Sequence, residues 1–188
     1  MNAVLKEFIE ILSGTLDNVD QVKEEQENEN QKHPYAKHIT SDCTHIVRNF
    51  PADNQGRYIL EESYYTYPGQ EMIIKPLLFY VTEKEGTVYL NSVTVPERLD
   101  PAKVINANVD LYFDHDELQI KESFGAAPYK YHPEEKHFTT DHFCEFAPGL
   151  TFRLTETLEH GKLSVMETWT KDGVVTTPYH TPIIYIKK

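Results

Sequence analysis

The chain has 188 residues, enough for one domain with a single hydrophobic core, and its 39% hydrophobic and 12% aromatic content is typical of a globular protein. Its formal net charge of −12 argues against nucleic acid or an anionic membrane as the main partner, because both bind basic surfaces. Neither a long apolar run for a transmembrane helix nor an apolar signal segment is present, since Lys6, Glu7 and Glu10 interrupt the start. We therefore expect a cytoplasmic protein.

Residues 1–31 show a helical pattern. Apolar residues from Val4 to Leu16 recur at the spacing of an amphipathic helix. Ser13–Thr15 should interrupt this helix, and Asp17 or Asn18 is suited to cap a second helical stretch. The acidic residues 23–31 lack an apolar face, which indicates solvated surface.

From Tyr35 the pattern changes to about eight to ten short strands separated by turns. This pattern predicts an antiparallel barrel or sandwich, and a barrel of this size can hold one small ligand. Pro76 interrupts one apolar run, which indicates an edge, a bulge or two pieces. Asp100-Pro101 favours a short helix. We expect a single domain, with the 1–31 segment packed on a barrel of residues 35–188.

The clearest hairpin lies between Leu150 and Lys171. His160-Gly161 fits a two-residue type I′ turn, and Asp172-Gly173 should form the next turn. The predicted cross-strand pairs are Leu158 with Leu163, Glu156 with Val165, Leu154 with Glu167, and Phe152 with Trp169. All eight side chains then share one apolar face.

Glu156 and Glu167 are unusual on that face. Carboxylates on a core face are unfavourable unless they are paired, hydrogen-bonded or in contact with water. One interpretation is a slipped register or an open, wet face. The other is a ligand cavity, with acidic groups among Leu154, Trp169 and nearby Tyr side chains. A third reading is a hydrolase that uses the two glutamates as an acid–base pair.

Residues 57–67 form a predicted strand rich in tyrosine. Glu62 and Tyr64 would share one face, and Glu61 and Tyr65 the other. The pattern does not decide which face is inward. Either face places a glutamate beside a tyrosine, a pair suited to a polar ligand edge, and either is equally compatible with ordinary strand tyrosines.

The cysteines and histidines do not form a recognisable catalytic or metal motif. Cys43 and Cys144 match no zinc spacing, and His132, His137 and His142 are spaced by five, which fits neither a strand nor a helix face. Cys144 lies between Phe143 and Glu145, which favours a buried structural thiol over a nucleophile. We expect no metal and no cofactor.

Residues 5–21 resemble the opening of the T-type phycobiliprotein chromophore lyases. That family begins with an apolar helix, a Gly, then an Asn and a Gln three residues apart, as Gly14, Asn18 and Gln21 stand here. Residues 61–65 and 168–173 are similar to its aromatic strand and its Asp-x-Gly turn. The family's Pro-Tyr-Arg motif is replaced by residues 72–77, so the resemblance supports the fold more than the activity.

The resemblance implies an all-β, lipocalin-like (calycin) antiparallel β-barrel with an N-terminal α-helix, a tetrapyrrole or other amphipathic ligand, and transfer to an acceptor protein. Lys75 is then expected to face the ligand's carboxylates. The alternative is a non-catalytic carrier or an interaction module, and a homodimer remains open. The candidate ligand-binding residues are Glu62, Tyr64, Tyr65, Lys75, Leu154, Glu156, Glu167 and Trp169.

Overall fold

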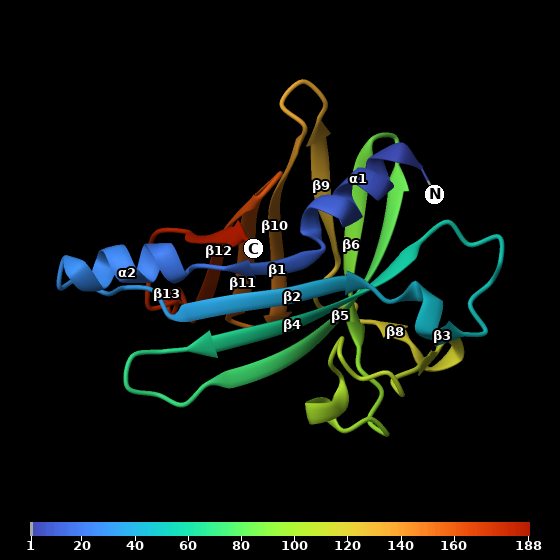
Figure 1. The fold of residues 1–188 in the computed structure, drawn as a ribbon, viewed down its shortest axis with the longest axis horizontal. Coiled ribbons are helices and arrows are strands. Elements are labelled where there is room, and N and C mark those ends of the chain that lie inside the picture. The colour runs from blue at the N-terminus through green and yellow to red at the C-terminus, as the bar shows by residue number, and fades with distance from the viewer. Residues whose placement is uncertain (1) are drawn as a thin grey trace.

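Ten strands form the wall of a closed antiparallel β-barrel in the computed structural model, which describes residues 2–188 (Figure 1). The barrel strands in chain order are β1 (Gly14–Asp17), β2 (Tyr35–Asp42), β4 (Arg57–Thr66), β5 (Ile73–Lys84), β6 (Thr87–Thr94), β9 (Ala126–His132), β10 (His137–Ala147), β11 (Leu150–Glu159), β12 (Lys162–Lys171) and β14 (Ile183–Lys187). Pairing of β11 with β12 and of β1 with β14 completes the ring. The predicted lipocalin-like barrel with an N-terminal α-helix is confirmed.

Strand β1 is the element that the sequence pattern does not predict. Leu16 continues the helical spacing, yet α1 (Ala3–Leu12) ends before it. Gly14 has φ 120°, and the chain then runs extended between β2 and β14, with Leu16 opposite His38 on one side and Lys187 on the other. Two neighbouring strands supply the hydrogen bonds that a four-residue strand could not make alone.

The hairpin register is confirmed at all four predicted pairs, from Leu158–Leu163 to Phe152–Trp169. The predicted turn type at His160-Gly161 is wrong. Gly161 has φ 82°, but His160 is not among the described residues with positive φ, and a type I′ turn requires both. Asp172-Gly173, with φ 50° and 80°, has the I′ signs and leads into β13 (Val174–Val175) as predicted.

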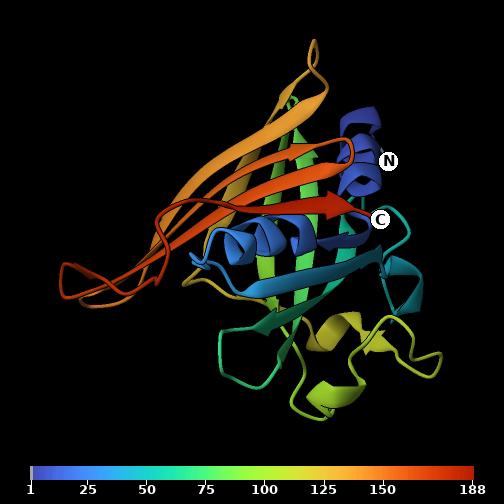
Figure 2. The same cartoon turned by 60° about the vertical axis from the view of Figure 1, so that its left-hand side comes forward.

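Helix α1 closes one end of the barrel. It contacts β2, β5, β6 and β11, strands that lie on different sides of the ring. Phe8 is fully buried and packs edge-on against Tyr129 and Phe138 inside. Asn2 donates to Glu83 near the β5–β6 turn, and Glu7 bonds His160 in the β11–β12 turn. Figure 2 shows α1 beside this turn.

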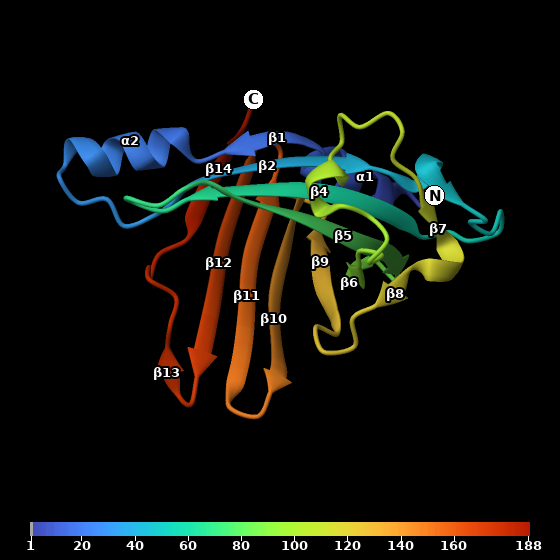
Figure 3. The same ribbon diagram turned by 90° about the horizontal axis from the view of Figure 1, so that it is seen from below.

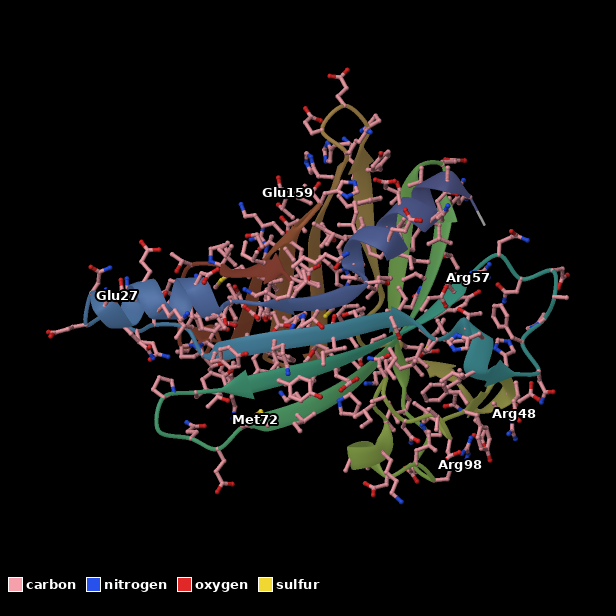
Figure 4. All side chains as sticks on the ribbon, in the orientation of Figure 1. Glu27, Arg48, Arg57, Met72, Arg98 and Glu159 are labelled. Carbon is pink, nitrogen blue, oxygen red and sulfur yellow. The ribbon has the colours of Figure 1, made fainter. Side chains whose placement is uncertain are left out.

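The β4–β5, β10–β11 and β12–β13 turns lie at the strand ends away from α1; in Figure 3 the β10–β11 and β12–β13 turns project downward side by side, and the β4–β5 turn projects to the left. Pro76 lies near this end. It pairs with Glu62 of β4, whereas β5 meets β6 only from Leu78 onward. Pro76 therefore occupies a local edge, one of its predicted settings. Met72, labelled in Figure 4, is exposed in the β4–β5 loop.

Residues 95–125 cover the outside of β4, β5 and β6. They contain η2 (Pro101–Lys103), capped by Asp100 near its predicted position, then β7 (Phe113–Asp114), η3 (His115–Glu117) and β8 (Gln119–Ile120). Strand β7 pairs with β3 (Val47–Arg48), which follows η1 (Thr44–Ile46). Arg48 and Arg98 both lie over the Tyr112 ring (Figure 4). A second hydrophobic core results, made of Cys43, Val47, Tyr58, Leu60, Leu78, Val93, Val104, Leu111 and Phe113.

Helix α2 (Val19–Glu27) lies across the outside and is tied down by two amides. Asn18 Nδ2 donates to Pro34 O (2.9 Å), and its Oδ1 accepts from Ala36 N (2.7 Å). Gln21 is held in the same way: its Nε2 donates to Pro182 O and its Oε1 accepts from Ile184 N, each at 3.0 Å. None of the helices within residues 2–188 combines the length and apolar character needed to cross a bilayer.

Candidate ligand-binding cavity

The barrel encloses a cavity of about 250 Å³. Six of the eight predicted residues line it: Tyr65, Lys75, Leu154, Glu156, Glu167 and Trp169. A smaller cavity of about 120 Å³ shares Tyr65, Lys75, Glu167 and Trp169 with it. Strands far apart in the sequence, β4, β5, β11 and β12, bring these side chains together.

Glu62 and Tyr64 lie elsewhere. They point to the outer face of β4, where Asn106 of the covering segment bonds Glu62 and Lys37 of β2 lies over the Tyr64 ring. Glu62 accepts from the backbone N–H and the side-chain amide of Asn106, at 2.6 and 2.8 Å, and from Tyr64 Oη at 2.5 Å. Glu62 is therefore buried as an anchor for the covering segment.

Glu61 and His38 line the cavity but were not among the predicted site residues. Glu61 occupies the inward face of β4, together with Tyr65, and the tyrosine-rich pattern left that choice of face open. His38 lies on β2 opposite Ser63, so it shares the same inner face. Burial along β2 marks the same inner face in the structure, because Ala36, His38 and Thr40 are buried and their neighbours less so; the local sequence of β2 carries no signal that identifies it.

Glu156 and Glu167 are the diagonal pair expected from the hairpin register. Both side chains lie inside the barrel. They are only partly shielded from solvent, because they line the cavity. Burial raises the pKa of Glu156 to about 8, although a hydrogen bond from Tyr129 opposes the shift. Burial and the nearby Glu61 raise the pKa of Glu167 to about 7, while Lys75 opposes this.

Tyrosine hydroxyls accompany the carboxylates. Tyr129 Oη donates to Glu156 Oε2 in a very short hydrogen bond. Burial, and after it the neighbouring Glu156, raises the pKa of Tyr129 well above its usual range. Burial raises the pKa of Tyr65 and Tyr185 in the same way. These hydroxyls therefore stay protonated. Each can donate a hydrogen bond to a neighbouring group and can also accept one.

His38 is buried beside the acidic side chains with one ring nitrogen unsatisfied. Its Nε2 lies 3.2 Å from Tyr65 Oη, and its ring packs at a tilt against Tyr185, with 4.4 Å between the ring centroids. Its Nδ1 lies 3.6 Å from Glu61 Oε1, too far for a hydrogen bond, and has no partner. Burial lowers the pKa of His38 although Glu61 opposes the shift, which favours the neutral imidazole.

Aromatic side chains form the wall toward the open end. Trp169 packs on Phe152 (4.7 Å between ring centroids) and on Phe146 (5.2 Å). Lys75 is exposed and lines both cavities, so its ammonium group lies at the opening. The cavity thus runs from an aromatic opening to an acidic interior.

The cysteines lack the surroundings of a nucleophile. Cys43 is buried in the second core, and burial raises its thiol pKa to about 12. Burial also raises the pKa of the half-buried Cys144. Within residues 2–188 no group of three His, Cys, Asp or Glu is arranged to hold a metal ion.

The fold and the site define a class: a closed antiparallel β-barrel with an interior cavity lined by aromatic and carboxylate side chains. No protein-family model, curated protein or solved structure is detectably similar to this chain. Its function is therefore inferred from the cavity itself.

Proposed function

We propose that the protein binds a compact amphipathic molecule inside the barrel and acts as a carrier for it. The observation that supports this most directly is the cavity of about 250 Å³, lined by apolar and aromatic side chains with a few convergent polar groups. Small-molecule sites are usually built in this way, and barrels are a common setting for them. Carboxylates in a core without such a role would be unfavourable.

The size of the cavity limits the ligand. Its volume lies just below the range of about 300–1,000 Å³ that is usual for small-molecule pockets. A ligand with one ring and a short chain fits within it, whereas a linear tetrapyrrole would have to extend through the opening past Lys75 and Trp169.

A bilin is the second candidate, favoured by the position of Lys75. Its ammonium group lies at the opening, where it would meet a ligand's carboxylates, as the resemblance to chromophore lyases leads us to expect. A carrier that delivers a bilin to an acceptor protein would show a red-shifted complex whose colour is released on denaturation.

A hydrolytic role for Glu156 and Glu167 is less well supported. An acid–base pair needs environments that push the two pKa values apart, so that one carboxyl is ionised while the other is protonated. Here burial raises both, to about 8 and about 7. We therefore favour binding over hydrolysis.

Trp169 is the only tryptophan of the chain and lines the cavity, so its fluorescence reports occupancy. We expect compact aromatic amphiphiles to change this fluorescence saturably. Biliverdin, titrated in parallel and followed by absorbance, tests the second candidate. Leu154→Phe, which narrows the cavity from the wall without adding a second tryptophan, should weaken binding by at least tenfold in a protein that still folds. An unchanged Trp169 signal with every compound would refute the carrier function.

A further inference from the structure

We infer that the ligand of this cavity is an organic cation, a protonated amine on a small aromatic or apolar body, which enters with its ammonium group toward the interior glutamates. This inference rests on the proposed carrier function and specifies its ligand class.

The first observation is an imbalance of charge. Glu61, Glu156 and Glu167 reach the cavity from β4, β11 and β12, whereas Lys75 is the one Lys or Arg that lines it within residues 2–188. Lys75 lies at the opening and is exposed, so water screens its charge. The carboxylates therefore lack a cation of the protein's own in the interior.

The second observation is an unfilled hydrogen-bonding position beside Glu61. His38 Nδ1 is buried, faces the same cavity and has no hydrogen-bond partner. A buried polar atom without a partner is unfavourable in a folded protein. Thr140 Oγ1, on β10 directly opposite Glu156, is also buried without a partner. Of these two residues only His38 lines the cavity, so a polar group of a ligand would satisfy its Nδ1 beside Glu61.

The third observation is the order of side chains along the hairpin. From the open end inward, β11 presents Phe152, Leu154 and Glu156, and β12 presents Trp169, Glu167 and Val165 opposite them. A cation that approaches the glutamates passes over aromatic faces, which attract it electrostatically. Its apolar body then rests against Phe152 and Trp169, so the cavity accommodates both parts of the molecule.

Proton release follows from this arrangement. In the empty cavity, protons neutralise Glu156 below about pH 8 and Glu167 below about pH 7, because burial raises the pKa of Glu156 to about 8 and that of Glu167 to about 7. When R–NH₃⁺ binds, its N–H bonds stay intact, the O–H bond of a glutamic acid breaks, and the proton leaves to the buffer through the open end. The titratable and charged groups that line the cavity are His38, Glu61, Tyr65, Lys75, Tyr129, Glu156 and Glu167. Tyr67 and Tyr179 face Glu167 from the adjoining cavity, and Tyr185 is buried close enough to interact with Glu61 and Glu167.

The test uses three compounds that share one body: 2-phenylethylamine, 2-phenylethanol and 3-phenylpropionate. Full-length protein is titrated with each by Trp169 fluorescence and by calorimetry, at pH 6, 7 and 8 and in phosphate and HEPES. We expect the amine to bind at least tenfold more tightly than the alcohol and the carboxylate. Its Kd should fall by up to about tenfold per pH unit as a proton is released, and the heat should depend on the buffer.

Variants separate the acidic groups from the rest of the cavity. Glu156→Gln and Glu167→Gln should each weaken amine binding by about tenfold or more, reduce proton release, and reduce the preference for the amine over the alcohol; a cooperative thermal unfolding transition shows that each variant is folded. Glu159→Gln is the matched control, because Glu159 lies on the same strand but pairs with Lys162 at the surface.

The outcomes are distinguishable. If the alcohol or the carboxylate binds as tightly as the amine, or if amine binding is independent of pH, the cation inference is overturned and the carrier function stands. If none of the three compounds binds, both fall. Equal affinities of Glu156→Gln, Glu167→Gln and Glu159→Gln for the amine would also overturn the inference.

Discussion

Glu61 and Glu62 are adjacent in sequence and have opposite surroundings. Glu61 faces the cavity, where it accepts from Ser63 Oγ (2.8 Å), whereas Glu62 lies on the outer face and holds Asn106. Alternation along a strand accounts for the difference, because consecutive side chains point to opposite faces. A one-residue shift of register would exchange their roles, so the pairing of β4 with β2 and β5 determines which carboxylate is in the cavity.

The pH dependence of stability should report the buried acids. In the folded protein the pKa of Glu156 is raised from 4.5 to about 8, and that of Glu167 from 4.5 to about 7. Between about pH 5 and 8 the folded protein therefore binds more protons than the unfolded chain, and the free energy of unfolding should fall as pH rises across this range. Relative to the wild type, Glu156→Gln should become more stable across this window by an amount on the order of a few kcal/mol.

Urea denaturation at half-unit steps of pH measures this difference. Glu159→Gln serves as the control, because this carboxylate is surface-exposed, and it should show a flat difference. A wild-type stability that rises steadily from pH 5 to 8, in parallel with Glu156→Gln, would contradict the raised pKa.

Glu62→Ala should destabilise the fold without affecting the cavity. It removes the carboxylate that accepts hydrogen bonds from the Asn106 N–H and the Tyr64 hydroxyl. A hydrogen bond to a charged group contributes about 1.5–3 kcal/mol to stability. We expect a loss of about 2–3 kcal/mol in the free energy of unfolding, faster amide exchange around residue 106, and unchanged ligand affinity. A large loss of affinity would place Glu62 in the binding site after all.

At the scale of elements, the hairpin was the most predictable part and β1 the least. Ten residues of apolar–polar alternation on each side of a Gly-containing turn define the pairs between β11 and β12 without help from the rest of the chain. Residues 14–17 contain one strongly apolar side chain, and their extended conformation depends on β2 and β14, which lie far away in sequence. Local patterns cannot reveal such a strand.

The same distinction explains the cavity. The sequence identifies Glu156, Glu167 and Trp169 because they share one hairpin. His38 and Glu61 join them only through closure of the ring, which is a property of the pairing order and not of any single segment. Glu62 and Tyr64 lie on the predicted strand but on its outer face, and the sequence does not predict that residues 95–125, which have little regular structure, cover that face.

Gln21 connects α2 to the last barrel strand through two backbone groups of the 182–184 segment. Gln21→Ala leaves Ile184 N–H and Pro182 C=O without this partner and should lower the free energy of unfolding by about 1–2 kcal/mol. Hydrogen exchange should show lost protection at the Ile184 amide. Gln26→Ala, on the exposed side of the same helix, is the control. Equal exchange of the Ile184 amide in both variants would argue against a stabilising contact between Gln21 and the 182–184 segment.

At the scale of the whole molecule, β14 completes the wall by joining β1 to β12. Removal of residues 183–188 would leave two unpaired edges and expose the interior, since Ile183 and Tyr185 are almost fully buried. Open edges promote association between chains. We expect this truncated protein to lose cooperative thermal unfolding and to elute as oligomers in size-exclusion chromatography. A monomer with a sharp unfolding transition would show that the barrel tolerates a gap.

The position of β1 also has a consequence for how the chain is made. Among the strands of the ring β1 comes first in the chain, yet one of its two neighbours, β14, is complete only at residue 187. Throughout translation the growing sheet therefore keeps one edge open, and closure must follow the release of the β14 segment. Nascent chains stalled just before β14 should bind holdase chaperones much more strongly than full-length chains that carry a C-terminal linker long enough to bring β14 out of the ribosome.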